Sequence, residues 1–186
     1  MKVAIVTFPG SNCDYDLYKC IQLVGGAPEF RWHRDVDLGE VDVVMLPGGF
    51  SYGDYLRAGA IATISPIMDA VKEFAKSGGP VVGICNGFQV LLKSGVLPLD
   101  ESPSGPAATL TWNDSGRFED RWVYLRTESN KSVFLSGIES LYLPVAHAEG
   151  KFVARDGGLF DQLQQRDQLV LRYTNAAGSC NGAVDY

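Results

Sequence analysis

Short, continuous apolar runs recur in the first half of the chain and are separated by segments with helical spacing. Three of these runs, Lys2–Phe8, Val41–Leu46 and Val81–Ile84, consist largely of β-branched and other apolar residues. Such runs are typical of strands that are covered on both faces, as in a parallel sheet. A fourth run, Phe30–His33, is a weaker candidate. Together they predict the strands of a mostly parallel sheet.

Between the runs, apolar residues recur every three or four positions, which is the spacing of one helix face. One predicted helix begins with Asp14 as its N-cap and ends at Gly25–Gly26. A second begins at Ser65–Pro66, because proline is favoured in the first helical turn, and a third spans Gly87–Lys93. Alternating strands and helices predict an α/β fold with helices on both faces of the sheet.

The second half of the sequence is richer in predicted strands than in helices. Residues 100–117 form a polar stretch rich in serine, proline and glycine, which we expect to be a loop. Because no convincing linker divides the chain, we expect residues 1–186 to form a single domain. The strands predicted in this half are Trp122–Thr127, Leu141–Ala146, Lys151–Ala154 and Leu169–Tyr173.

Composition and charge argue against some classes of function and leave the predicted fold unchanged. The net charge is −6 and no basic cluster is present, which argues against nucleic-acid binding. No apolar run approaches the ~18 residues that a membrane helix needs. The apolar start Met1–Val6 is too short for a signal peptide. We therefore expect a cytoplasmic protein that does not bind a membrane.

The four cysteines and two histidines bear on metal and thiol chemistry. No two cysteines have the C-x-x-C spacing that is common in zinc sites, so no metal site is expected. A chain of this length forms a core without disulfides, so free thiols are expected. The cysteines are Cys13, Cys20, Cys85 and Cys180.

The most informative motif lies where the third strong strand runs into the following helix. Cys85 stands there between Gly83 and Gly87. This pattern is that of a nucleophile elbow with sulfur in place of the usual serine oxygen. The glycines are expected because a Cβ would clash in so tight a turn. A helix N-terminus would stabilise a thiolate, so Cys85 is the predicted nucleophile, and a buried structural cysteine is the alternative.

Backbone N–H groups suited to an oxyanion occur at two places in the sequence. The N–H of Asn86 directly follows the nucleophile, and Gly48 and Gly49 follow the second strong strand. We predict that these groups bind the oxyanion, and a merely flexible loop is the alternative for the glycines. The same loop holds Ser51 in a G-x-S-x-G pattern. We discount Ser51 as a nucleophile because no clear amphipathic helix begins directly after it.

A thiol hydrolase normally needs a general base, and the sequence offers His33 and His147. Glu149 follows His147 by two positions, so motif logic alone suggests Cys85, His147 and Glu149 as a triad. His33 is interpreted as a surface or strand-end histidine. The polar stretch that begins at Asn113 could contact a substrate carboxylate or a partner, or could equally be a solvated loop.

The elbow sequence Gly83–Gln89 resembles the nucleophile motif of the class I, or triad-type, glutamine amidotransferases. Within that family, three further segments resemble the glutaminase subunits of purine biosynthesis. The similarity runs from the first strand to about Tyr186. The three segments are Phe8–Asp14, Pro47–Arg57 and Pro144–Gly150.

The resemblance implies a flavodoxin-like three-layer fold and hydrolysis of glutamine through a thioester on Cys85. Gln89 matches the family position that contacts bound glutamine, and Gly49 and Asn86 would hold the oxyanion. Ammonia would pass to a large synthetase subunit that makes formylglycinamidine ribonucleotide with ATP and magnesium. A small accessory subunit of the same complex is also implied. Because this chain has no phosphate-binding motif, no cofactor is expected in it.

One departure from the family concerns the base. In the family, the catalytic histidine and glutamate belong to a His-Pro-Glu motif near the C-terminus, and the sequence to Tyr186 contains none. We therefore expect that a C-terminal segment is lacking here. His147 and Glu149 match a different, upstream motif, so they are secondary candidates without triad roles. Two other functions stay open: a cysteine hydrolase or stress protein on the same fold, and a non-catalytic docking domain.

Overall fold

A computed structural model of the protein describes residues 1–98, 107–129 and 131–180. The chain divides into two compact units, unit 1 (Met1–Pro106) and unit 2 (Ala107–Tyr186). The expectation of a single domain stays a prediction. Within the described ranges, no helix is long and apolar enough to cross a membrane.

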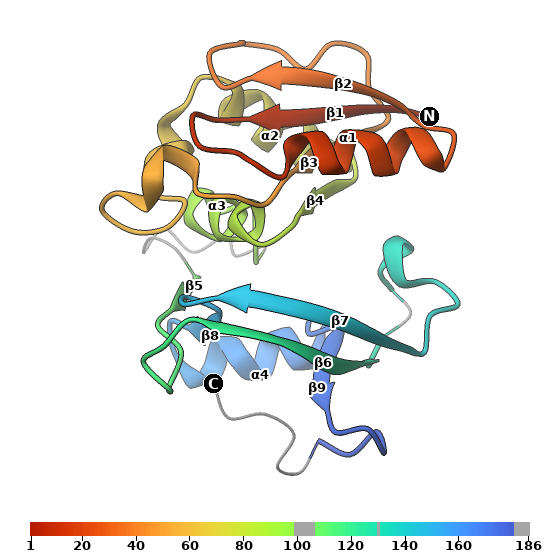
Figure 1. Ribbon diagram of the computed structural model, residues 1–186, viewed down its shortest axis with the longest axis vertical. Helices are drawn as coiled ribbons and strands as arrows, with labels where there is room; N and C mark the ends of the chain where they lie inside the picture. Colours follow the sequence, from red (N-terminus) through yellow and green to blue (C-terminus); the bar gives the residue numbers. More distant parts are fainter. Residues whose placement is uncertain (99–106, 130, 181–186) are drawn as a thin grey trace. The chain divides into compact units, whose positions relative to one another are not determined.

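Unit 1 is built on a four-stranded parallel sheet with the strand order β2-β1-β3-β4 (Figure 1). The strands predicted from the strong apolar runs are confirmed, and β1 and β3 are almost wholly buried. The strand β2 begins earlier than the weak candidate at Phe30. The strands are β1 (Lys2–Thr7), β2 (Ala27–Trp32), β3 (Val43–Leu46) and β4 (Val81–Gly83).

Side chains of β1 alternate between the two faces of this sheet, as the pleat of a strand requires. Val3 and Ile5 pack with Ile21 of α1 on one face. Ala4 and Val6 belong to a larger cluster that includes residues of α2 and α3. Helices therefore cover both faces, which confirms the expected three-layer α/β fold (Figure 1). The helices are α1 (Asp14–Leu23), α2 (Ile67–Lys76) and α3 (Asn86–Ser94).

The carboxyl ends of these parallel strands lie at one edge of the sheet. The turns that leave β1, β3 and β4 at this edge include residues 8–13, 47–50 and 84–85. The chain changes direction across the sheet between β1 and β3. In open α/β sheets, ligands bind outside the carboxyl ends of the strands at such a point. The predicted nucleophile and oxyanion glycines therefore lie where this fold binds ligands.

Unit 2 consists of two antiparallel sheets and the helix α4 (Figure 1). The central strand of the larger sheet is β6, with β7 and β9 on either side. In the smaller sheet β5 pairs with β8, and α4 packs Leu159 and Leu163 against residues of β8. The four strands predicted in this half are confirmed. The elements are β5 (Ala108–Thr111), β6 (Glu119–Thr127), β7 (Ser140–His147), β8 (Lys151–Ala154), α4 (Gly157–Gln165) and β9 (Leu171–Thr174).

Three local features differ from the predictions. The predicted loop over 100–117 contains the strand β5, and its residues 100–106 lie outside the described part of the chain. The pattern does not predict α4, because only Leu159 and Leu163 supply its buried face. The N-cap of α1 is Cys13 rather than Asp14, because the Cys13 carbonyl already accepts the N–H of Leu17, so the helix begins one residue earlier than expected.

Candidate active site

Cys85 lies between β4 and α3, where the chain turns sharply from sheet into helix. Its φ of 54° and ψ of −112° are unusual for a residue other than glycine. The side chain of Cys85 does not cap the helix that follows, and the residue is exposed. Strained backbone of this kind persists where the surrounding fold enforces it, and it is common at functional sites. The structure thus gives Cys85 the geometry of a nucleophile elbow.

The two glycines on either side of Cys85 are required by close packing rather than by an unusual φ. A Cβ on Gly83 would lie 2.7 Å from the backbone of Gly87. A Cβ on Gly87 would overlap the carbonyl group of Leu46 in β3. The expected clash is therefore present, but the strained dihedral belongs to Cys85 itself.

Gly48 and Gly49 leave the end of β3 beside the elbow. A Cβ on Gly48 would lie 3.3 Å from the Cβ of Cys85, so the two backbones approach closely. Gly49 has a φ of 134°, and a side chain there would overlap Asn12. Glycine is thus needed at position 49, whereas a side chain at position 48 would crowd Cys85, and the structure brings the predicted oxyanion loop next to the predicted nucleophile.

A turn after β1 supports this glycine loop, and its role was not predicted. The N–H of Cys13 donates to the carbonyl of Gly48 at 3.3 Å, and the N–H of Phe50 donates to the carbonyl of Gly10 at 3.0 Å. The Cys13 sulfur would lie 3.5 Å from a Cβ on Gly48. Burial, together with the nearby Cys85, raises the pKa of the Cys13 thiol. The only sequence signal was the Phe8–Asp14 motif, which the family resemblance includes without giving it a role.

Asn86 and Gln89 lie on the first turn of α3. The Asn86 side chain is 3% exposed and donates to Gln89 Oε1 at 3.0 Å and to Asp54 Oδ1 at 3.1 Å. Its own oxygen accepts the N–H of Ser51 at 3.0 Å. The structure therefore brings the two predicted substrate-binding residues of α3 into one polar cluster with the glycine-rich loop.

Ser51 lies in this cluster but not at an elbow. It begins the short 3-10 helix Ser51–Asp54 and is 2% exposed. Its hydroxyl oxygen is buried without a hydrogen-bond partner among the described residues. A buried hydroxyl away from a strand end is poorly placed to attack a substrate, in agreement with the G-x-S-x-G pattern having been discounted.

His33 follows β2 and is buried, so the interpretation as a strand-end histidine holds and that of a surface histidine is wrong. Its Nδ1 lies 2.8 Å from the hydroxyl of Tyr52, which also lies 2.9 Å from the Ser65 hydroxyl. Burial and the neighbouring Arg34 lower the pKa of His33. This histidine therefore anchors the glycine-rich loop through Tyr52.

His147 ends β7 in unit 2, and Asn113 holds it. The Asn113 side chain is 3% exposed and its oxygen lies 3.0 Å from His147 Nδ1. Its nitrogen donates to the backbone carbonyl of His147 at 2.8 Å and to that of Arg117 at 2.9 Å. Burial lowers the pKa of His147. Asn113 is thus buried rather than solvated, and Glu149 lies in the turn between β7 and β8.

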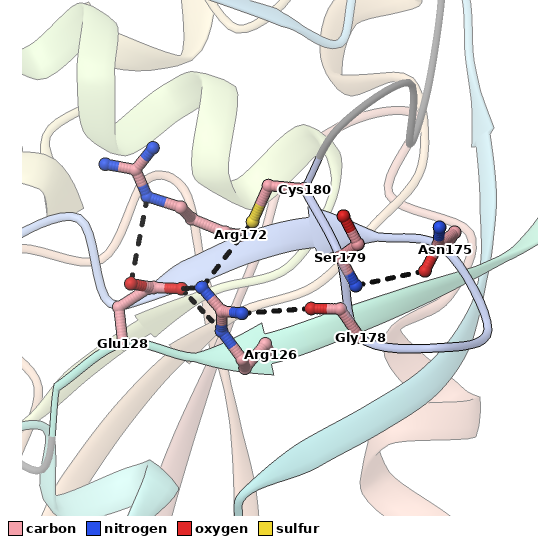
Figure 2. A network of polar contacts seen from close by, with 7 residues as sticks. All are labelled: Arg126, Glu128, Arg172, Asn175, Gly178, Ser179 and Cys180. Atoms are coloured by element: carbon pink, nitrogen blue, oxygen red, sulfur yellow. Dashed lines mark hydrogen bonds and ion pairs between the residues drawn. The ribbon is translucent and has the colours of Figure 1, made fainter.

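Cys180 lies in a separate polar network of unit 2, shown in Figure 2. The guanidinium of Arg126 donates to Glu128 at 2.6 and 2.8 Å and to the Gly178 carbonyl at 2.9 Å. It also lies 3.5 Å from the Cys180 sulfur. Arg172 approaches the other Glu128 oxygen at 4.0 Å. These contacts tie the turn after β9 to β6, which indicates a structural network.

Comparison with known proteins agrees with the elbow chemistry. Residues 1–186 match the family of CobB/CobQ-like glutamine amidotransferase domains. Phosphoribosylformylglycinamidine synthase subunit PurQ of Methanopyrus kandleri is 44% identical over 99% of this chain and 79% of its own length. The same subunit of Synechocystis is 47% identical over 94% of this chain and 75% of its own length.

A solved structure has a similar architecture. The structure of PurLQS from Thermotoga maritima contains a chain with a TM-score of 0.77 and 32% sequence identity. The match covers 98% of this chain and 79% of that one. The resemblance to class I glutamine amidotransferases is thereby confirmed. This chain belongs to the family of CobB/CobQ-like glutamine amidotransferases.

Proposed function

We propose that this chain is a glutaminase that hydrolyses glutamine through a thioester on Cys85. The observation that carries the proposal is an exposed cysteine in a strained strand-to-helix turn, with the backbone of Gly48 against it. Family membership supports glutamine chemistry over that of a general cysteine hydrolase or stress protein, which could use the same type of turn.

In the proposed reaction, the Cys85 sulfur attacks the carbonyl carbon of the glutamine side-chain amide. The carbonyl electron pair moves to oxygen, where the N–H groups of Gly49 and Asn86 would bind the oxyanion. The C–N bond then breaks, the nitrogen takes up a proton, and ammonia leaves a glutamyl thioester. Water attacks this thioester, which releases glutamate and restores the thiol. The first turn of a helix favours the negative charge that develops at both steps.

Gln89 is proposed to contact the bound glutamine, because it lies one turn after the nucleophile on the same helix. His147 and Glu149 stay secondary candidates. The contacts of His147 with Asn113 support a role in shaping the turn between β7 and β8. The family match over residues 1–186 supports a single amidotransferase domain that includes both units.

The ammonia is proposed to pass to a synthetase that makes formylglycinamidine ribonucleotide in purine biosynthesis. The support is the name of the relatives, phosphoribosylformylglycinamidine synthase subunit PurQ, and the match to a chain of PurLQS. A large synthetase subunit would bind ATP and magnesium, and a small subunit would complete the complex. A biosynthetic enzyme of this kind works in the cytoplasm.

The test compares two nitrogen sources in the assembled complex. Cys85→Ala should abolish glutamine-dependent synthesis, because the nucleophile is removed, and should leave ammonia-dependent synthesis intact. Both rates are measured from the product formed. Loss of both activities would show that Cys85 is needed for assembly instead. Unchanged glutamine-dependent synthesis would contradict the proposal and favour a docking domain without catalysis.

A further inference from the structure

The buried side-chain amide of Asn86 donates both of its N–H groups to partners inside the candidate site. An asparagine amide has two N–H donors, and here one lies on Asp54 Oδ1 and the other on Gln89 Oε1. Its oxygen accepts the N–H of Ser51, which lies 35 residues away in sequence. With 3% exposure, water does not substitute readily for these partners.

The orientation of this amide follows from hydrogen-bond partners that can only donate or can only accept. The backbone N–H of Ser51 can only donate, so the oxygen of Asn86 faces it. An ionised carboxylate at Asp54 can only accept, so the nitrogen of Asn86 faces that side. The nitrogen must then also face Gln89, which turns the Gln89 oxygen toward Asn86. The Nε2 group of Gln89, a donor, is directed away from Asn86.

The same cluster holds a strained loop in place. Tyr52 and Asp54 both have a positive φ, of 54° and 55°, which is an unfavourable conformation for residues other than glycine. Asn86 bonds the loop at Ser51 and Asp54, and the Tyr52 hydroxyl is held by His33. A purely structural role for Asn86 would consist of this loop contact alone.

We infer that the side chain of Asn86 is a positioning residue that fixes which end of the Gln89 amide meets the substrate. With its oxygen held by Asn86, Gln89 offers N–H donors to an acceptor oxygen of the bound glutamine. This inference rests on the proposed function, since it assumes that Gln89 contacts glutamine. The backbone N–H of Asn86 stays an oxyanion donor whatever side chain the residue carries.

Exchanging the hydrogen-bond donor and acceptor at positions 86 and 54 distinguishes a role in positioning Gln89 from a role in supporting the loop. Asn86→Asp keeps the acceptor for Ser51 but removes both donors and sets two carboxylates side by side. Adding Asp54→Asn restores a donor between the two positions, now pointing the other way, at unchanged net charge. In this double variant Gln89 must turn its nitrogen toward the new carboxylate. Its oxygen then faces the substrate.

Three measurements on the full-length protein distinguish these effects. Unfolding in urea reports loop support, and alkylation of Cys85 by iodoacetamide reports access to the thiol. Saturable inactivation by a diazo-ketone analogue of glutamine reports recognition through its half-saturation concentration. Gln89→Glu is a second test that leaves the loop contacts alone, because a carboxylate still accepts from Asn86 but has no donor for the substrate.

The double variant should unfold like the natural sequence and alkylate at the same rate, yet need about tenfold more analogue for half-saturation, as expected for one lost hydrogen bond. Gln89→Glu should show the same rise. Recovery of both stability and half-saturation in the double variant would reduce Asn86 to loop support and overturn the inference. So would normal half-saturation in Gln89→Glu. A natural protein that iodoacetamide alkylates but the analogue never modifies would instead refute the proposed function.

Discussion

The helices α3 and α4 begin in opposite ways. At the start of α4, Asp156 is extended and its carboxylate accepts the N–H of Leu159 at 2.8 Å. At the start of α3, the N-cap residue Cys85 has a positive φ and its side chain does not cap the first turn. The first N–H groups of a helix have no partner within it. In α4 a side chain satisfies one of them. In α3 the N–H groups of Gly87 and Phe88 donate to the carbonyls of Ile84 and Cys85, and the N–H of Asn86 is the one proposed to bind the oxyanion.

This difference separates a helix start built for stability from one built for chemistry. A side-chain N-cap contributes about 1 kcal/mol, whereas a non-glycine residue in a strained conformation costs about 1–3 kcal/mol. At α3 both effects oppose stability. The cost is offset by the buried sheet, because the Ile84 N–H is bonded to Leu46 of β3 and the helix packs on that face. Taken by itself, the first turn of α3 is thus less stable than that of α4, and it is there that the proposed reaction uses the Asn86 N–H.

The largest expected effect comes from adding a methyl group at Gly87. Gly87→Ala places a Cβ against the Leu46 carbonyl and should lower the free energy of unfolding by about 3 kcal/mol. The matched control is Gly157→Ala in the first turn of α4, where a Cβ meets no atom within 4 Å. The control should be neutral or stabilising, by up to about 1 kcal/mol. Urea unfolding measures both, and equal effects would contradict the packed elbow.

The next effect is an inverted order of glycine and alanine at position 85. Because Cys85 has a φ of 54°, Cys85→Gly should be more stable than Cys85→Ala by about 1–2 kcal/mol. Cys20 is an exposed cysteine inside α1, and there alanine should be the more stable replacement by about 1 kcal/mol. Thermal unfolding of the four variants checks the order. If glycine and alanine variants had the same order of stability at both sites, the argument that Cys85 is strained would fail.

Removing the cap of α4 should cost somewhat less. Asp156→Ala leaves the Leu159 N–H without its acceptor and should lower the free energy of unfolding by about 1 kcal/mol. Asp156→Asn keeps an acceptor oxygen and should recover most of this loss. Urea unfolding gives both values. A loss that Asp156→Asn fails to recover would show that charge, rather than capping, matters there.

The smallest effect is a pH dependence of stability from unit 2. Burial lowers the pKa of His147, so the folded state favours the neutral ring. As the pH falls below the ordinary value of 6.5, the unfolded chain takes up the proton first, and stability falls. His147→Gln should flatten this slope when unfolding is followed between neutral and mildly acidic pH. Since burial also lowers the pKa of His33, part of the slope should remain. A slope unaffected by the change would show that His147 does not contribute.

The sequence predicts the parts of this protein that local pattern controls. Continuous apolar runs indicate β1, β3 and β4 because strands covered on both faces leave no polar position. The elbow was predictable because a strand, a cysteine between glycines and a helix are contiguous at Cys85. The predicted chemistry of this elbow depends on residues that are neighbours in the sequence.

Long-range contacts account for most of what could not be predicted. The bonds from Asn86 to Ser51 and Asp54 span more than 30 residues, and the one from Asn113 to His147 spans 34. No spacing rule connects such residues. In the sequence, Cys13 appears only as one residue of the Phe8–Asp14 motif. Its position beside Gly48 depends on how β1 and β3 pair. The helix α4 was missed because so few of its residues are buried.

Mapping the site of covalent modification by the diazo-ketone analogue of glutamine tests the central claim most directly. The protein is treated with the analogue, digested, and its peptides are sequenced by mass spectrometry, with and without excess glutamine. We expect a single adduct on the Cys85 sulfur that glutamine prevents. An adduct on Cys13, Cys20, Cys180 or Ser51 that glutamine likewise prevents, with Cys85 unmodified, would contradict the account.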